Sequence, residues 1–333
     1  MEEKEGMTTK LRERYVRSRL ELIEWYIILR RLVDSFYDIQ DVRMRTANRL
    51  RQMPQQAILY VGQLQKLEDR LKGQIASMLK QEPIYLSFFS RIMGVGPLIS
   101  GFVISQTMIR FDLISKEEFE RAKELLDDPE AKEPAPFTIT QIRLSQKTEK
   151  GGYRVPQLRG IGKFDNPSNY HSWWGLGVEK ETERSPQRAE GKLLKYNPKL
   201  RMFSWRIGRS FKMQKASKSF YRRIYNGYKK RLFENPRTIK VKGEMVLSPP
   251  FKEILKNPKL CPRYQDCKDR LTKREEPACK GHWDNMSIRY ADKIFLEHTW
   301  EQWSTLEGLP VRKPYAIDKL GHHTYIDWEP DRE

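Results

Sequence analysis

Three cysteines and one histidine form the most chemically specific cluster in the sequence. Cys261, Cys267, Cys279 and His282 follow the pattern Cys-x5-Cys-x11-Cys-x2-His, and the chain has no other cysteine. Three thiolates and one imidazole are a common tetrahedral ligand set for Zn2+. Four protein ligands leave no open coordination position, so we expect a structural site, a small zinc knot. The alternative is three incidental thiols beside a surface histidine, because the first spacing is wider than usual.

A glycine-rich turn between two apolar segments is the second feature that could carry function. Residues 85–105 contain Gly94-Val95-Gly96-Pro97. Glycine permits positive φ, and Pro97 suits the first position of a helix. The pattern is typical of a helix-hairpin-helix, in which the turn at Gly94 and Gly96 and the positive end of the second helix bind a phosphate. The alternative is a buried pair of helices joined by an ordinary turn.

Basic and aromatic residues alternate through the segment 199–240. Lys and Arg stand at fourteen positions there, against one acid, Glu234. Cations neutralise phosphates and aromatic rings stack on bases, so we expect a cationic helix over 206–231 that contacts nucleic acid. Its candidate contacts are Arg201, Arg206, Arg209, Lys212, Lys215, Lys218, Arg222 and Arg223. In the alternative interpretation, the rings pack in the core and the charged groups face solvent. Both interpretations can be true of one amphipathic helix.

Composition favours the same class of partner. The 333 residues carry a formal net charge of +19, which an acidic polymer would offset. DNA is the expected partner, with structured RNA or an anionic membrane surface as alternatives. No apolar run approaches the roughly 20 residues of a membrane span, and the acidic N-terminus lacks the apolar core of a secretory signal. We therefore expect no membrane association and a cytoplasmic location, where thiols stay reduced.

The elements that must position these residues are mainly helical. Apolar spacing predicts long helices over 8–53 and 55–80, a coiled-coil-like helical hairpin that buries its stripes by pairing or by forming a homo-oligomer. Ser115 and Glu118 form a capping-box pattern. Further along, 137–147 is a short strand or exposed helix, 151–167 a loop, and 286–306 an amphipathic helix.

The expected fold class is thus mainly α, in four segments. Residues 1–82 form the helical hairpin and residues 83–135 a helix-hairpin-helix domain. Residues 136–240 form a basic helical region, and residues 241–333 hold the zinc knot followed by a C-terminal helix and tail.

No catalytic motif is visible from spacing alone. The sequence lacks a P-loop, a nucleophile elbow and a His-Glu-x-x-His motif, and no acidic cluster of the kind that nucleases use is apparent. From its residues alone, the chain is predicted to be a basic, mainly helical nucleic-acid-binding protein.

Three spaced motifs resemble one known family. Ile92–Gly101 looks like the helix-hairpin-helix that opens the second, serine-bearing domain of the RuvC-related DEDD-type insertion-sequence transposases, the bridge-RNA-guided recombinases. Trp173–Leu176 is similar to that domain's aromatic/Ala-x-Gly-Leu segment. Gly191–Lys195, followed by Leu200-Arg201, is similar to its G-x-I-x-K-x-G-N-x-x-L-R signature. The resemblance covers roughly residues 55–235 and implies DNA binding in transposition or recombination, on branched or deformed DNA, with Lys195 among the contacts.

The chain also departs from the family. The family's ribonuclease-H-like first domain with its metal-binding acids has no counterpart here, so catalysis would require a RuvC-like partner in trans. The resemblance places the family's DNA-attacking serine nearest to Ser185, but Pro186 follows it where glycine is expected. A transposase with a serine nucleophile is one hypothesis. The other is a non-catalytic DNA- or RNA-binding scaffold derived from such a domain.

Overall fold

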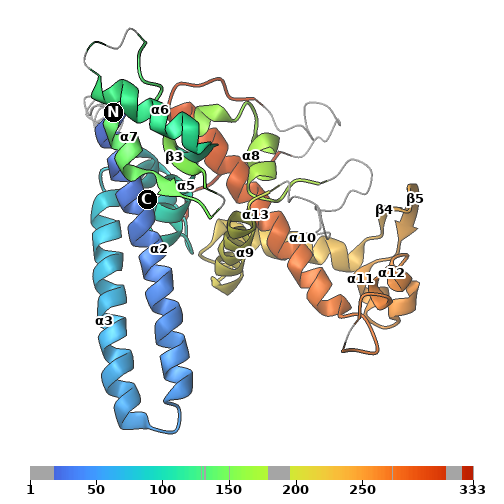
Figure 1. Ribbon diagram of the computed structural model, residues 1–333. Coiled ribbons are helices and arrows are strands. Elements are labelled where there is room, and N and C mark those ends of the chain that lie inside the picture. The colour runs from blue at the N-terminus through green and yellow to red at the C-terminus, as the bar shows by residue number, and fades with distance from the viewer. Residues whose placement is uncertain are drawn as a thin grey trace. The chain divides into compact units, whose positions relative to one another are not determined.

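The computed structural model describes residues 19–128, 130, 133–149, 151–178, 196–271, 273–312 and 325–332 (Figure 1). Helices dominate these residues, so the prediction of a mainly α protein is confirmed. The chain divides into two compact units. Unit 1 comprises Met1–Ser90 and Gly96–Lys163, and unit 2 comprises Arg91–Val95 and Phe164–Glu333.

Two long helices form the hairpin of unit 1. Helix α2 spans Arg19–Arg49 and helix α3 spans Pro54–Leu79, and they lie side by side (Figure 1). Pro54 starts α3 at a position where its missing N–H costs no hydrogen bond. Arg43 pairs with the buried carboxylate of Glu68 across the hairpin. Residues 8–18 of the first predicted helix lie outside the described residues.

The apolar segment after the hairpin forms a buried helix. Short helix α4 (Pro83–Ser87) and 3-10 turn η1 (Phe89–Arg91) lead to α5 (Pro97–Met108). Every residue from Ser100 to Met108 is buried. A methyl group added at Gly101 would lie 3.1 Å from side-chain atoms of both Val33 and Ile75, so glycine lets α5 approach α2 and α3 closely. Helix α5 is therefore part of the core of unit 1.

A three-stranded antiparallel sheet completes unit 1. Strand β3 (Tyr153–Leu158) pairs with β1 (Ile109–Ile114) and with the short β2 (Gln146–Lys147). The prediction that 151–167 is only a loop is therefore wrong. The glycines that suggested a loop flank β3 instead of interrupting it, and Gly151 (φ 86°) forms the turn before it.

Two helices connect the strands of this sheet. Helix α6 (Lys116–Asp127) follows β1, and α7 (Ile139–Leu144) precedes β2. The Ser115 hydroxyl and the Glu118 carboxylate form the predicted capping box at the start of α6.

Four helices build the core of unit 2: α8 (Pro167–Trp173), α9 (Pro198–Met213), α10 (Phe220–Glu234) and α13 (Cys279–Leu306). The prediction of a single cationic helix over 206–231 is wrong. The helix breaks after Met213, and the Ser219 hydroxyl caps the new helix by accepting from the N–H of Arg222 at 3.3 Å. The break turns the basic segment back on itself, and Phe211 stacks on Tyr221 with centroids 4.6 Å apart.

The remainder of unit 2 is built from short elements. Strands β4 (Arg237–Val241) and β5 (Glu244–Ser248) form a hairpin whose turn residues, Lys242 and Gly243, both have positive φ. Helix α11 (Phe251–Ile254), turn η3 (Pro258–Leu260) and helix α12 (Tyr264–Lys268) follow. Helix α13 begins at Cys279 and so extends further towards the N-terminus than the predicted 286–306. No helix among the described residues is long and apolar enough to cross a membrane.

Candidate functional site

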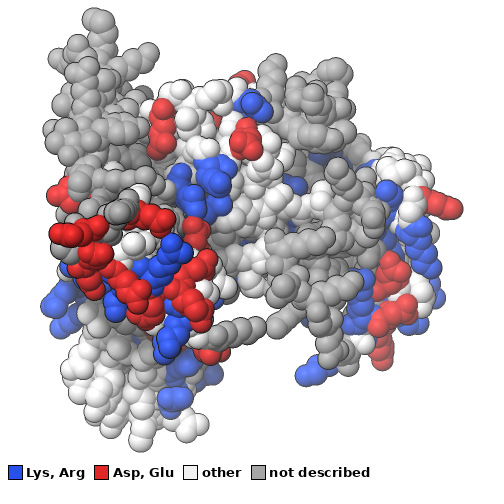
Figure 2. Space-filling view, turned by 45° about the horizontal axis from the view of Figure 1, so that its top comes forward, with Lys and Arg blue, Asp and Glu red and all other residues white. Residues whose placement is uncertain are grey.

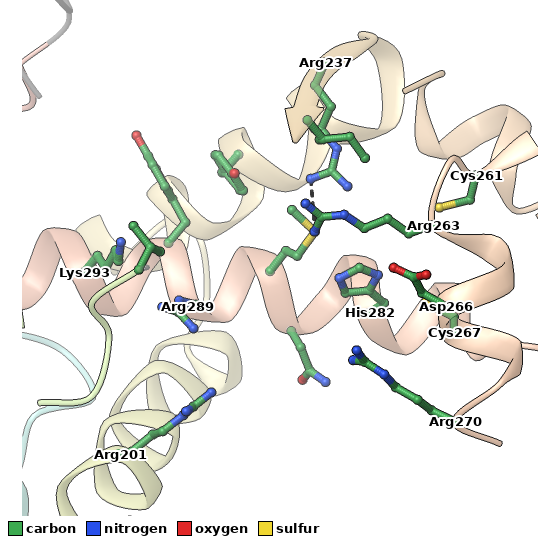
Figure 3. Close-up of a pocket in the computed structure, with 16 residues that line it drawn as sticks. Arg201, Arg237, Cys261, Arg263, Asp266, Cys267, Arg270, His282, Arg289 and Lys293 are labelled. Carbon is green, nitrogen blue, oxygen red and sulfur yellow. Dashed lines mark hydrogen bonds between the residues drawn. The ribbon is translucent and has the colours of Figure 1, made fainter. Parts of the chain in front are cut away.

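A basic cavity of about 520 Å3 lies within unit 2. Its lining comes from α9, α10, β4, the cysteine-bearing segment and α13 (Figure 3). One carboxylate, Asp266, is among the described residues that line it. Six cations also line the cavity: Arg201, Arg237, Arg263, Arg270, Arg289 and Lys293. In Figure 2, Lys and Arg side chains lie along the right edge of the molecule together with Asp and Glu side chains, on the side where β4 and α12 lie in Figure 1.

One face of α13 forms a wall of this cavity. His282, Met286, Arg289 and Lys293 recur at intervals of three or four residues, which places them in a row along the helix. The guanidinium of Arg289 donates hydrogen bonds to the carbonyl oxygens of Leu176 and Gly177, at 2.7 and 3.2 Å. Arg289 is therefore held in place by neutral backbone acceptors.

Mutual repulsion and burial perturb these cations. Burial, followed by the charge of Arg201, lowers the pKa of Arg289 to about 10. Burial, followed by the charge of Arg289, lowers the pKa of Lys293 to about 8, although Glu297 partly offsets the effect. A bound anion would favour the charged form of both groups, because an opposite charge raises the pKa of a nearby cation.

The other arginines are oriented by their neighbours. Arg237 donates to the sulfur of Met286 at 3.2 Å and lies 5.2 Å above the centroid of the Phe251 ring. Arg263 donates to the carbonyl oxygen of Lys240 at 2.5 Å. Figure 3 shows Arg263, Asp266 and His282 together at the end of the cavity nearest the cysteines.

Two tyrosines add an aromatic surface to the cavity. Tyr228 on α10 and Tyr290 on α13 both line it, and their rings stack with centroids 3.9 Å apart. Arg231 lies 4.7 Å above the Tyr228 ring. The cavity therefore combines cations with π surfaces, the two groups that bind phosphate and base or sugar.

Several cations of the basic segment contact other groups of the chain. Lys212 and Lys229 both contact the carboxylate of Asp284, at 2.5 and 2.6 Å. Arg222 donates to the backbone carbonyl of Lys212, and Arg223 lies 3.3 Å from the carboxylate of Glu329. These groups link α9, α10, α13 and the C-terminal residues.

Other predicted cations are exposed, and Arg201 alone of the set lines the cavity. The exposed ones are Arg206, Arg209, Lys215 and Lys218. Arg209 lies 4.9 Å above the ring of Trp205, which is 45% exposed. Most of the interleaved rings, by contrast, are core: Phe203, Phe211, Phe220, Tyr221 and Tyr225 are buried. Trp205 is the clearest exposed stacking surface on α9.

The glycine turn has an asymmetric geometry. Gly94 has φ of +94°, and its carbonyl oxygen accepts from the Ser210 hydroxyl at 2.6 Å. Gly96 is exposed and caps α5 with a φ of −94°, so Gly94 alone of the two needs glycine's freedom. The N–H of Met93 donates to the Asp331 carboxylate at 2.8 Å. The backbone N–H of Met93, beside this turn, is therefore already bonded to a carboxylate of the chain itself.

The predicted metal ligands share one neighbourhood. Cys261, Cys267 and His282 line the cavity, and Cys261 and Cys279 pack beside Trp283 on a small apolar cluster. None of the three cysteines is in a disulfide. The described residues contain no group of three or more Cys, His, Asp or Glu side chains arranged to hold a metal ion as they stand.

Two predicted residues, Ser185 and Lys195, lie outside the described residues. Conversely, four cavity cations were not predicted: Arg263, Arg270, Arg289 and Lys293. Arg237 was one of the fourteen basic positions of 199–240 but was not among the candidate contacts. The spacing of Arg289 and Lys293 on one face of α13 was the available signal. The others come from separate elements, and only folding brings them together.

Searches of protein-family models, curated proteins and solved structures find no match for this chain.

Proposed function

We propose that this chain binds nucleic acid and acts as a transposase-like DNA-binding protein in DNA transposition or recombination, on branched or deformed DNA. The observation that carries the proposal is the cavity of unit 2, where six cations and one carboxylate converge. Phosphate neutralisation supplies most of the affinity of such proteins, and arginine can bind phosphate through two parallel hydrogen bonds.

The electrostatics of the cavity favour a phosphate backbone over a neutral ligand. Burial and repulsion from neighbouring cations both disfavour the charged forms of Arg289 and Lys293. A phosphate diester between them would replace this repulsion with attraction. The stacked pair Tyr228 and Tyr290 offers a surface for an adjacent sugar or base.

The outer face of α9 extends this interface. Arg206, Arg209 and the exposed Trp205 lie on consecutive turns of the helix, and Lys215 and Lys218 follow it in the α9–α10 connection. A tryptophan with a guanidinium stacked on it can receive an unstacked base while the cation contacts the neighbouring phosphate. This arrangement suits a deformed or branched DNA better than a regular duplex.

The resemblance of the sequence motifs to the serine-bearing transposase domain supports transposition or recombination as the process. On this proposal, Gly94 and Gly96 contact phosphate, and Ser185 forms a covalent DNA adduct when a RuvC-like partner supplies the metal-binding acids. Replacing Ser185 with alanine would then abolish an adduct that the wild type forms. If the wild type forms no adduct with the partner present, the catalytic part of the proposal is wrong.

A non-catalytic DNA- or RNA-binding scaffold is the second candidate. Pro186, which follows Ser185 where the family has glycine, favours it. Competition between ligands distinguishes the two. Labelled four-way junction, bound at about 0.15 M salt, is challenged with linear duplex, single-stranded DNA and structured RNA. A preference for the junction supports recombination, whereas equal competition by all four means that charge alone binds.

We further propose that the hairpin of unit 1 mediates self-association with a second copy. Apolar side chains are exposed near its turn, among them Ile58 (76%), Leu59 and Tyr60 on α3 and Val42 on α2. Replacing Ile58 with lysine is expected to shift sedimentation of the protein towards the monomer. The exposed Gln56→Lys variant is the control, because it adds the same charge two residues earlier, on another face of α3. A wild type that sediments strictly as a monomer ends this proposal.

A further inference from the structure

The segment between α11 and α13 lacks a hydrophobic core of its own. From residue 255 to residue 280, none of the described residues is buried. The segment nevertheless folds into compact turns, in which the N–H of Tyr264 donates to the carbonyl of Cys261 at 2.8 Å and that of Cys267 to the carbonyl of Arg263 at 3.0 Å. Ordering a chain costs conformational entropy that apolar burial normally offsets. A different tether must supply that stabilisation here.

The cysteines lie where such a tether would act. Cys261 and Cys279 come from opposite ends of the segment and pack against the same small cluster, Leu232, Phe251 and Ile254. Cys267, which lies between them in sequence, lines the same cavity as Cys261. The three cysteines therefore lie in one part of unit 2, and we refer to them as a cluster.

The histidine belongs to the same cluster. Cys279 is the first residue of α13, and His282 lies three residues along it, on the same face of the first turn. The His282 ring lies 6.2 Å from the ring of Phe251, centroid to centroid, and lines the cavity together with Cys261 and Cys267. Sulfur and imidazole donors thus come from the residue after η3, from α12 and from the start of α13.

We propose that Cys261, Cys267, Cys279 and His282 bind one Zn2+ that fastens the segment 255–280 to the first turn of α13. The three thiols lose their protons on binding, and the imidazole binds as the neutral base. Side chains must draw together, because they do not stand at coordinating positions now. Two positive groups support the anionic complex of three thiolates and one Zn2+: the N-terminus of α13 and Arg237, which lines the same cavity as Cys261.

His298, also on α13, already has a hydrogen-bond partner at each ring nitrogen. Its Nε2 lies 2.7 Å from the carbonyl oxygen of Ile326, and its Nδ1 lies 2.9 Å from the hydroxyl of Tyr221. With Nε2 protonated, this imidazole donates to the carbonyl and accepts from the tyrosine. Both nitrogens serve packing, so His282 is the imidazole that the site would use.

The site would also have a consequence for the cavity. Arg263 and Arg270 are carried by the segment that the metal fastens, and both line the cavity. Zinc would hold these two cations in place. The metal site itself does not depend on nucleic-acid binding, since a chain that bound Zn2+ and no nucleic acid would still confirm it.

Cobalt substitution tests the site on the full-length chain. Metal-free protein is titrated with Co2+ under reducing conditions. The expected result is one Co2+ per chain, with thiolate-to-cobalt charge-transfer absorption and the d–d bands of a tetrahedral ion, displaced by one equivalent of Zn2+. Absence of these bands from the wild type would overturn the proposal without reference to any variant.

Variants assign the ligands. Cys261→Ser, Cys267→Ser, Cys279→Ser and His282→Ala should each weaken Co2+ binding by about 100-fold or more. Asp269→Asn, which removes a carboxylate from the same segment, is the control and should bind normally. If each cysteine variant kept the wild-type spectrum and affinity, the assignment would be wrong.

Limited proteolysis gives a readout that does not require a variant. In the wild type, Zn2+ should protect the Lys and Arg residues of 255–280 from trypsin, and a chelator should expose them while α9 and α10 stay protected. Equal cleavage with and without metal would contradict a structural role for the ion.

Discussion

Two groups of cations in unit 2 differ in what surrounds them. On α9 and α10, Lys212 and Lys229 share the carboxylate of Asp284, and Arg222 donates to a backbone carbonyl. In the cavity, six cations line a space that one carboxylate, Asp266, enters. In the first group, the two lysines share one carboxylate of the fold. In the second, six cations gather around one carboxylate, and a ligand phosphate would add negative charge there.

This difference shows that basic density along a sequence and basic density in space are separate properties. The segment 199–240 is the most basic stretch by count, yet folding uses part of its charge to join helices. The cavity draws its cations from α9, β4, the cysteine-bearing segment and α13. If the cavity is the interface, its cations should control affinity, and those around Asp284 should control stability.

Removing two cavity cations should have the largest effect. The double substitution Arg270→Gln and Lys293→Gln should weaken junction DNA binding by about 100-fold at 0.15 M salt, since each lost phosphate contact costs on the order of tenfold. Fluorescence anisotropy measures it. The exposed pair Lys230→Gln and Lys252→Gln removes the same charge outside the cavity and should cost about threefold or less. Equal losses in both proteins would show that net charge alone binds.

The close approach of α9 and α13 gives the next largest effect. A methyl group at Gly208 would lie 2.6 Å from Cγ2 of Ile288 and 2.9 Å from its carbonyl oxygen. Gly208→Ala should therefore lower the free energy of unfolding by about 2 kcal/mol through overpacking. It should also weaken binding, because it separates Arg201 from Arg289.

Gly227 on α10 provides the matched control. A methyl group there would have no neighbour within 4 Å, so Gly227→Ala should raise stability by about 0.5–1 kcal/mol through helix propensity. Both changes are measured by urea denaturation. Opposite signs at the two glycines are the predicted result, and a stabilising Gly208→Ala would contradict the packing described.

The cations around Asp284 should reveal a structural role. Hydrogen bonds from Lys212, Lys229 and Tyr225 hold the pKa of the Asp284 carboxyl well below its usual range. A lowered carboxyl pKa stabilises the fold above the usual pKa, and this stabilisation is lost as the pH falls. Asp284→Asn should thus cost about 1 kcal/mol near pH 7 and flatten the acid side of the stability curve. DNA affinity should change little, and a large loss of affinity would place these cations in the interface.

The pH dependence of binding should show the smallest effect. Lys293, with a pKa near 8, is partly neutral in the free protein above that pH. A phosphate raises this pKa, so binding takes up a proton and affinity falls as the pH rises from 7 to 9, by about threefold to tenfold. Lys293→Arg keeps its charge and should remove most of this dependence. An unchanged profile in the arginine variant would exclude Lys293 as its source.

The sequence predicted those elements of the fold that depend on local signals. The capping box at Ser115 and Glu118 formed as expected because its hydrogen bonds join residues three apart. Strand β3 was missed because its stability comes from pairing with β1, which lies about 40 residues earlier in the chain. The break between α9 and α10 was also missed. It follows from the packing of Phe211 on Tyr221 and from the Ser219 cap, which no periodicity reveals.

The site was predictable in part for the same reason. Arg201 was identified from the basic run, and the cysteines and His282 from their clustering in sequence. Arg263 carried no signal and Arg237 did not stand out from the basic run, because they become neighbours only when β4 and the cysteine-bearing segment fold beside α13. Among aromatic residues, the sequence could not separate Trp205, which is exposed, from Phe203 and Phe211, which face the core.

The salt dependence of junction binding tests the central claim most directly. If six to ten phosphates are neutralised, the logarithm of the association constant should fall against the logarithm of salt concentration with a slope of about −5 to −9. The Arg270→Gln, Lys293→Gln protein should give a slope shallower by about 2, and the Lys230→Gln, Lys252→Gln control should keep the wild-type slope. Identical slopes for the wild type and the cavity variant would contradict the claim that phosphates enter this cavity.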